Sequence, residues 1–294
     1  MLFFNAESIN GMSNEFVLTL SCPDRKGIVH AISGALLKAG GNIIESSQFG
    51  DPDTQLFFQR THFSLDHLEL LSNLQADIQK ESIRLQMKWA LHPASQKMRV
   101  MVAVSKLGHC LNDLLYRWKA EQLPIEICAV CSNHRDLESL TRSYGVSFHY
   151  LPIEESKKAS QEDQLLDIVN AQKIDLVLLA RYMQILSSSL CEELYGRVIN
   201  IHHSFLPSFK GAQPYRQAHQ KGVKLIGATA HYVTTQLDEG PIIEQDVERV
   251  GHQINHLDMA RIGADIESRV LARAVKWHAE RRLFINGSKT VVFS

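Results

Sequence analysis

The sequence has no run of about 18 apolar residues, so no segment is long enough to span a membrane as a helix. Its apolar start, Met1 to Phe4, is far too short for the core of a signal peptide, and no basic residue precedes it. We therefore expect no membrane partner, and a protein of the cytoplasm.

An excess of charge of one sign is also lacking. The 31 Lys and Arg residues against 32 Asp and Glu residues give a formal net charge of −1. This balance provides no global attraction to nucleic acid, so no nucleic-acid partner is expected. With 45% hydrophobic and 21% charged residues, the 294-residue chain has a globular composition. The length suits two domains of ordinary size or one large domain.

Cysteine is scarce and irregularly spaced. An odd number of cysteines, five, argues against a disulfide framework. Cys128 and Cys131 form a C-x-x-C, but they fall in an apolar run typical of a strand, where residues three apart point to opposite faces. No second Cys pair or Cys/His pair completes a zinc site. We expect buried, inert thiols and no bound metal.

The first part of the chain alternates short strand and helix patterns. The expected order is strand, helix, strand, strand, helix, strand, at residues 16–21, 28–39, 42–49, 55–65, 66–79 and 83–92. Asp66 is expected to cap the second helix. This βαββαβ order is typical of a ferredoxin-like sandwich. A polar stretch containing Pro93 follows, so we expect a first domain over residues 14–93 and a second over 98–294.

The second part alternates strand and helix over longer units. Strands are expected at residues 99–105, 125–131, 146–151, 176–180 and 198–202, with helices between them, such as 111–121, 136–144 and 162–171. Repeated βα units with apolar strands indicate an α/β fold with a Rossmann-like, mostly parallel sheet. Beyond Phe205 we expect a loop, a short helix, a strand and a loop. A long amphipathic helix then covers about residues 256–280.

Polar side chains gather where one of these strands ends. Ligands of open parallel sheets bind beyond the carboxyl ends of the strands. Asn200 and His202, two apart on a strand, share a face, whereas His203 should point away and be structural. Asp238 lies in a later polar loop, and His231 on the strand before it is either a support or a core residue. No G-x-S-x-G elbow is present, and the amide, imidazole and carboxylate suit acyl-group chemistry.

Two separated motifs carry a family resemblance. N-I-H-H-S-F-L-P at residues 200–207 and D-E-G-P at 238–241 resemble the folate-dependent formyltransferases. The resemblance implies catalytic roles, with Asn200 and His202 stabilising an oxyanion and Asp238 handling the proton. It also implies 10-formyltetrahydrofolate as the substrate and no tightly bound cofactor.

A third motif, L-A-R-Y-M-Q-I-L at residues 179–186, resembles the loop that lines the family's folate pocket. In that loop, backbone groups bind the pterin and apolar side chains pack beside it. The substrate-binding positions that the resemblance implies are Arg181, Met183, Gln184, Ile185 and Leu186, with Gly211 in a later loop.

The N-terminal run S-C-P-D-R-K-G-I-V at residues 21–29 resembles the opening of an ACT domain. This resemblance implies an amino-acid effector at Asp24, Arg25 and Gly27, and a homo-oligomer formed by edge-to-edge pairing of sheets. An ACT domain joined to this fold resembles the deformylase branch of the family, in which water accepts the formyl group.

Two other functions remain open on the sequence. One is formyl transfer to an amine such as glycinamide ribonucleotide, and the other is a catalytically silent amino-acid sensor. The first βα loop, residues 105–112, has one glycine and bulky Leu, Lys and His side chains. It is poorly suited to cradle a nucleotide phosphate, which favours water as the acceptor.

Overall fold

The computed structural model describes residues 13–153, 158–206 and 214–294 of the chain. The chain divides into two compact units. Unit 1 comprises the chain up to Gln96 together with two later segments, Arg281–Asn286 and Val291–Ser294. Unit 2 comprises Lys97–Glu280 and Gly287–Thr290. None of the helices within the described ranges is long and apolar enough to cross a lipid bilayer.

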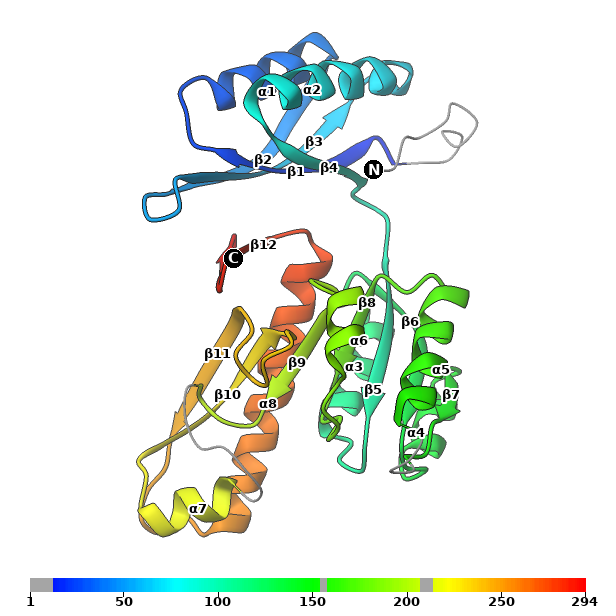
Figure 1. Ribbon diagram of the computed structural model, residues 1–294, viewed down its shortest axis with the longest axis vertical. Helices are drawn as coiled ribbons and strands as arrows, with labels where there is room; N and C mark the ends of the chain where they lie inside the picture. Colours follow the sequence, from blue (N-terminus) through cyan, green and yellow to red (C-terminus); the bar gives the residue numbers. More distant parts are fainter. Residues whose placement is uncertain (1–12, 154–157, 207–213) are drawn as a thin grey trace. The chain divides into compact units, whose positions relative to one another are not determined.

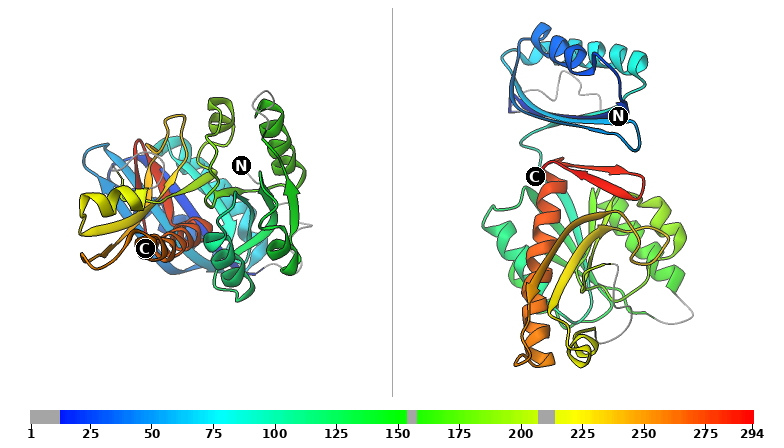
Figure 2. Two further views of the ribbon diagram at one scale, coloured as in Figure 1. Left: turned by 90° about the horizontal axis from the view of Figure 1, so that it is seen from below. Right: turned by 90° about the vertical axis from the view of Figure 1, so that its left-hand side faces the viewer.

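Unit 1 is a four-stranded antiparallel sheet with two helices on one face (Figures 1 and 2). Its sheet has the strand order β2-β3-β1-β4. The predicted βαββαβ order is confirmed. In chain order its elements are β1 (Glu15–Pro23), α1 (Ile28–Lys38), β2 (Gly41–Asp51), β3 (Leu56–Leu65), the 3₁₀ turn η2 (Leu68–Leu70), α2 (Leu71–Leu85) and β4 (Lys88–Pro93).

The core of unit 1 follows from the two periodicities in its sequence. Alternate residues of β1 point toward the helices, and α1 contributes residues three and four apart. Phe16 of β1 stacks on Phe63 of β3, with ring centroids 5.9 Å apart. The fully buried side chains of this core include Phe16, Leu18, Leu20, Ile28, Ile32, Leu36, Phe63, Leu65, Leu74, Ile78 and Leu85.

Two details of unit 1 differ from the expected pattern. The second helix extends to Leu85, so Ile83, expected to begin a strand, is helical and 74% exposed. The helix continues because Ile78, Ser82 and Leu85 keep a helical spacing against the core, and it ends at Gln86 in the left-handed conformation. Asp66 does not cap this helix, because a 3₁₀ turn, Leu68–Leu70, comes between them.

Unit 2 is built on a seven-stranded sheet with the order β11-β10-β9-β8-β5-β6-β7. Strands β9, β8, β5, β6 and β7 run parallel, whereas β10 and β11 are antiparallel to their neighbours. The predicted mostly parallel sheet is confirmed. Its elements are β5 (Met98–Val104), α3 (His109–Lys119), β6 (Ile125–Ser132), α4 (Glu138–Ser143), β7 (Ser147–Tyr150), α5 (Lys158–Ala171), β8 (Leu176–Leu179), α6 (Ser188–Glu193), β9 (Val198–His202), α7 (Pro214–Lys221), β10 (Leu225–Tyr232), β11 (Ile242–Arg249) and α8 (His256–Ala279).

The last two strands, β12 (Leu283–Asn286) and β13 (Lys289–Val292), form a hairpin that the sequence pattern did not reveal. Arg281–Asn286 and Val291–Ser294 group with unit 1, and Gly287–Thr290 group with unit 2. Arg282 binds both carboxylate oxygens of Glu45, at 2.9 and 3.2 Å. Phe284 packs edge-on against Phe58 of β3, with ring centroids 5.6 Å apart. These contacts cover the face of the unit 1 sheet opposite α1 and α2.

Candidate active site

The site in unit 2 is set by the pairing of β9 with β10. These strands are antiparallel, and Asn200 lies directly opposite His231. After β10 the chain makes a loop that brings Asp238 back to the end of β9, and Asp238 holds a positive φ of 57°. The tight return depends on Gly240, since a Cβ there would collide with the Tyr232 carbonyl oxygen.

The three residues expected to be catalytic meet at this point. His202 Nδ1 lies 3.2 Å from Asp238 Oδ2, and Asn200 Nδ2 lies 3.5 Å from Asp238 Oδ1. The hydrogen bond with His202 holds the pKa of Asp238 well below its usual range, despite its burial. Asp238 is therefore ionised at neutral pH, and it can orient the imidazole beside it.

The second ring nitrogen of His202 faces the other way. His202 lines a cavity, and within the described residues its Nε2 atom is buried and has no hydrogen-bond partner. A buried polar atom without a partner costs free energy, and such atoms in native sites are commonly reserved for a ligand. With Nδ1 bound to Asp238, Nε2 is the atom that can reach a substrate.

The cavity is walled by two loops of mainly uncharged residues. The loop after β8 contributes the predicted substrate-binding residues Arg181, Met183, Gln184, Ile185 and Leu186, and the loop after β10 contributes residues 233–238. Met183 and Ile185 are 60% and 57% exposed, which is high for large apolar side chains. Such a wall fits the face of an aromatic ring system. Gly211, also predicted to bind substrate, lies outside the described residues.

A hydrogen bond between the segments that follow β5 and β8 fixes the loop after β8. The Met183 backbone N–H donates to Ser105 Oγ at 3.1 Å, and Ser105 Oγ donates to Asn133 Oδ1 at 2.7 Å. Arg181 adopts a positive φ of 64° at the start of this loop. The main chain of the cavity wall is therefore held from the first βα loop of unit 2.

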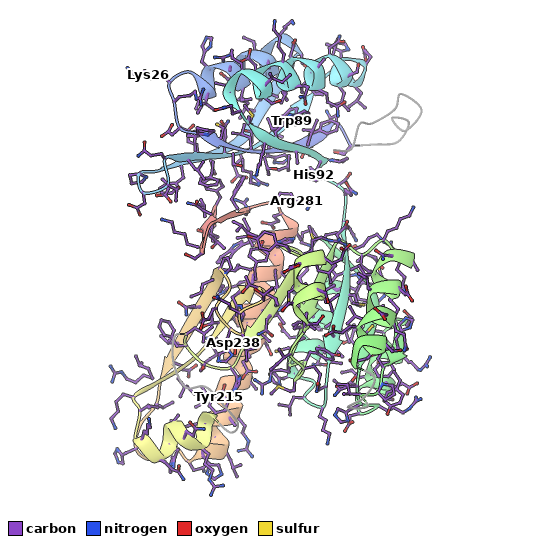
Figure 3. The ribbon with its side chains drawn as sticks, viewed as in Figure 1. Lys26, Trp89, His92, Tyr215, Asp238 and Arg281 are labelled. Carbon is purple, nitrogen blue, oxygen red and sulfur yellow. The ribbon has the colours of Figure 1, made fainter. Side chains whose placement is uncertain are left out.

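A buried ionic cluster beside the cavity was missed by the sequence reasoning. Glu267 of α8 is 2% exposed and contacts His109 Nε2 at 2.8 Å, Tyr215 Oη at 2.8 Å and Arg181 Nε at 3.5 Å. Burial alone would raise the pKa of Glu267, but the bonds from His109 and the charge of Arg181 outweigh it and leave the pKa lowered. Figure 3 labels one residue of this cluster, Tyr215, and one residue of the site beside His202, Asp238.

This cluster is an ion network and makes a poor metal site. His109, Cys110 and Glu267 lie close enough to share an ion. However, hydrogen bonds from His109 and Tyr215 already occupy both Glu267 oxygens, and burial raises the pKa of the Cys110 thiol, which therefore stays protonated. The signal in the sequence was a Glu among the apolar positions of the last helix, where Gly263, Ile266 and Val270 are also buried.

His203 does not point away from the site as expected. Strand β9 ends at His202, so the alternation of side chains stops there. The rings of His202 and His203 lie 4.9 Å apart, and both line the cavity. Burial, together with the charges of Arg181 and His202, lowers the pKa of His203 to about 4, so the ring is neutral at pH 7.

The predicted effector residues lie in the loop before α1 of unit 1. Gly27 precedes the helix with a positive φ of 94°, a conformation that glycine adopts without strain. The Asp24 N–H donates to the Gln55 carbonyl at 2.8 Å, and Arg25 Nη2 donates to Gln86 Oε1 at 3.1 Å.

The two thiols of β6 that were expected to be buried and inert differ in burial: Cys131 is buried and Cys128 is half-buried. Burial raises the pKa of both.

The two units match two known families. Residues 16–76 match the ACT domain model, and residues 98–275 match the formyl transferase model. Fold and site together thus define a formyl transferase enzyme that carries an ACT domain.

Similarity to whole proteins narrows this class. The chain is 47% identical over 277 residues to the formyltetrahydrofolate deformylase of Corynebacterium sp. (strain P-1), covering 94% of this chain and 97% of that one. It is 45% identical to the deformylase of Bacillus subtilis (strain 168), covering 97% and 96%. The chain belongs to the formyltetrahydrofolate deformylase family.

Solved structures agree with this assignment. The crystal structure of formyltetrahydrofolate deformylase from Burkholderia mallei ATCC 23344 superposes with a TM-score of 0.92 at 47% identity, covering 96% of this chain and 100% of that one. A glycinamide ribonucleotide transformylase from Symbiobacterium toebii reaches 0.63 at 30% identity and covers 68% of this chain. The likeness to the transformylase is therefore partial, whereas the likeness to the deformylase spans both units.

Proposed function

We propose that this chain hydrolyses 10-formyltetrahydrofolate to formate and tetrahydrofolate at the site formed by Asn200, His202 and Asp238. The observation that carries the proposal is the paired His202 and Asp238 beside a cavity with apolar walls, which His202 lines and where its Nε2 has no hydrogen-bond partner among the described residues. The pterin ring occupies the cavity beside Met183 and Ile185. The formyl group lies beside His202 and Asn200. Formate made in this way supplies one-carbon metabolism and purine synthesis.

The proposed chemistry begins with attack of water on the formyl carbon. The carbonyl electron pair moves to oxygen, and the oxyanion accepts hydrogen bonds from the Asn200 amide and from protonated His202 Nε2. The ionised Asp238 beside Nδ1 stabilises the imidazolium that this requires.

Asp238 then handles the proton of the attacking water. Its lowered pKa keeps it in the proton-accepting form but makes it a weak base. It therefore takes the proton after the oxygen–carbon bond has begun to form, when the water has become acidic. The proton passes to N10, the oxyanion electron pair re-forms the carbonyl as the C–N10 bond breaks, and the free amine leaves. The formic acid formed in this step loses its remaining proton to solvent and becomes formate. No tightly bound cofactor takes part.

The contacts at the carboxyl ends of β5 and β8 favour water over an amine as the formyl acceptor. Ligands of doubly wound sheets bind where the strand order reverses, and in this sheet the reversal lies between β5 and β8. The hydrogen bond between Ser105 and Met183 joins the segments that follow these two strands, and the contacts of His109 and Arg181 with Glu267 join the same segments to α8. At this point the polar side chains already bind one another, which favours water over a nucleotide as the acceptor.

The decisive experiment incubates the full-length protein with 10-formyltetrahydrofolate and no acceptor. We expect stoichiometric release of formate and tetrahydrofolate, and at least about a 10²-fold loss of kcat in Asp238→Asn if this carboxylate transfers the proton. Absence of formate release, or formation of tetrahydrofolate only after an amine such as glycinamide ribonucleotide is added, would exclude the hydrolase. Wild-type turnover by Asp238→Asn would remove Asp238 from the mechanism.

At unit 1 we propose an amino-acid effector in the loop that contains Asp24, Arg25 and Gly27, and a homo-oligomer formed through edge strands of the sheet. The match to the ACT domain model over residues 16–76 supports both proposals. Titration calorimetry with single amino acids tests the first, because heat of binding is expected for one of them and is lost in Arg25→Ala. Light scattering of the full chain tests the second.

A further inference from the structure

His231 is a buried residue of the site, and none of the proposed steps of hydrolysis passes a proton through it. It is 2% exposed and stands opposite Asn200 on the paired strand. The register between β10 and β11 shifts between Ala230 and His231. Such bulges redirect a side chain, and they are common beside active sites.

A backbone carbonyl determines which ring nitrogen of His231 carries the proton. His231 Nδ1 lies 2.9 Å from the carbonyl oxygen of Tyr232. A carbonyl oxygen only accepts, so Nδ1 must carry the hydrogen and donate it. In the neutral ring, Nε2 is then left with a lone pair and needs a donor. This carbonyl can lie where it does because residue 240 is glycine and has no Cβ to collide with it.

The donor is the side-chain amide of Asn200. Its Nδ2 lies 3.2 Å from His231 Nε2, closer than the 3.6 Å from Nε2 to Asp238 Oδ1. An amide can be placed in two orientations, and only the one with Nδ2 toward Nε2 satisfies this lone pair. One hydrogen of the amide is thereby committed to His231.

The second hydrogen of the Asn200 amide has a weaker partner, Asp238 Oδ1 at 3.5 Å. It is the hydrogen that a developing oxyanion can attract. We propose that His231, as the neutral Nδ1–H tautomer held by the Tyr232 carbonyl, is a positioning residue that orients the Asn200 amide to donate to the formyl oxygen. The role in catalysis rests on the proposed hydrolysis, whereas the tautomer and the amide orientation do not.

Nuclear magnetic resonance of the full-length protein labelled with ¹⁵N in histidine tests the tautomer without any assay of activity. The His231 signals are identified by their loss in His231→Gln. We expect a protonated Nδ1 and an unprotonated Nε2 at neutral pH. An Nε2–H tautomer, or a doubly protonated ring paired with Asp238, would overturn the proposal even if formate is released.

Two variants of the same position test the role in catalysis. Glutamine can both donate to the Tyr232 carbonyl and accept from Asn200, whereas leucine can do neither. We expect His231→Leu to lower kcat by about tenfold, with KM for the folate unchanged, less than the 10²–10³-fold cost of removing an oxyanion donor outright. His231→Gln should recover most of that loss. An equal loss of kcat in both variants, or a change in KM with kcat unaffected, would contradict the proposal.

A double-mutant cycle and a matched control separate positioning from general damage. If His231 acts through Asn200, His231→Leu should change kcat by less than about twofold in the Asn200→Ala background. Full additivity of the two changes would overturn the proposal. The control is His278→Phe, which breaks the 2.7 Å hydrogen bond between His278 Nδ1 and the Tyr232 hydroxyl without contacting Asn200. Its kcat is expected to match the wild type.

Discussion

At the scale of single residues, buried charge organises this site. Asp238 faces His202 on one side and the Asn200 amide on the other, and Glu267 collects His109, Tyr215 and Arg181. In both clusters a carboxylate keeps a depressed pKa because donors surround it. Charges buried in this way hold their partners in fixed directions, and removing one partner leaves the others unpaired.

The Glu267 cluster permits a stability prediction. Glu267→Gln preserves size but leaves Arg181, whose side chain is only 10% exposed, without its counter-charge. We expect a loss of about 3 kcal/mol or more in the free energy of unfolding, as for other broken buried ion pairs. Urea denaturation of unit 2, followed by the fluorescence of Trp277 on α8, measures it. Arg261→Gln on the same helix, whose pair with Asp258 is exposed, should cost less than about 1 kcal/mol. Equal costs would contradict the prediction.

At the scale of elements, the periodicity of apolar residues predicted helices and strands correctly where a single period continued over the whole element. The alternation of β1 and the helical spacing of α1 are visible in the sequence because each buries one regular face. The end of α2 was not visible, because the exposed Ile83 looked like the start of a strand. Strand β11 has several charged residues and only one fully buried position, so it resembled a loop.

The same limits apply to the site. Asn200, His202 and Asp238 were found because they fall in compact motifs whose order could be recognised. The contact between His231 and Asn200 depends on the register of an antiparallel pair formed by strands about 30 residues apart in sequence, which no local pattern encodes. Glu267 gathers partners from three other segments, and only the folded chain reveals them together.

The C-terminal hairpin is the element for which the structure adds most to the sequence. Phe284 covers Phe58, which is 2% exposed, and Arg282 forms a bidentate pair with Glu45. We expect Phe284→Ala to destabilise unit 1 by about 2 kcal/mol, less than for a fully buried phenylalanine. Hydrogen exchange of peptides from β2 and β3 should accelerate accordingly. Leu37→Ala, at a position 79% exposed in the same unit, is the control and should leave these rates unchanged.

At the scale of the whole molecule, the acid sensitivity of the fold should be set in part by histidines that are buried in the neutral form. Burial, with a smaller contribution from the charge of Arg281, lowers the pKa of His92 on β4 to about 4 (both residues are labelled in Figure 3). His203 in unit 2 has its pKa lowered to about 4 as well. In an unfolded chain a histidine has a pKa of about 6.5.

The sign of the effect follows from these pKa values. Above pH 6.5 neither state of the chain protonates His92, whereas between pH 6.5 and about 4 only the unfolded state binds the proton. Stability is therefore lost as the pH falls through this window, by up to about 3 kcal/mol for a shift of this size. Urea denaturation of unit 1, followed by the fluorescence of Trp89, should show a shallower loss between pH 7 and pH 4.5 in His92→Gln. His67→Gln, at a side chain 66% exposed, should keep the wild-type slope. Parallel pH profiles for wild type and His92→Gln would show that His92 does not govern the acid stability of this unit.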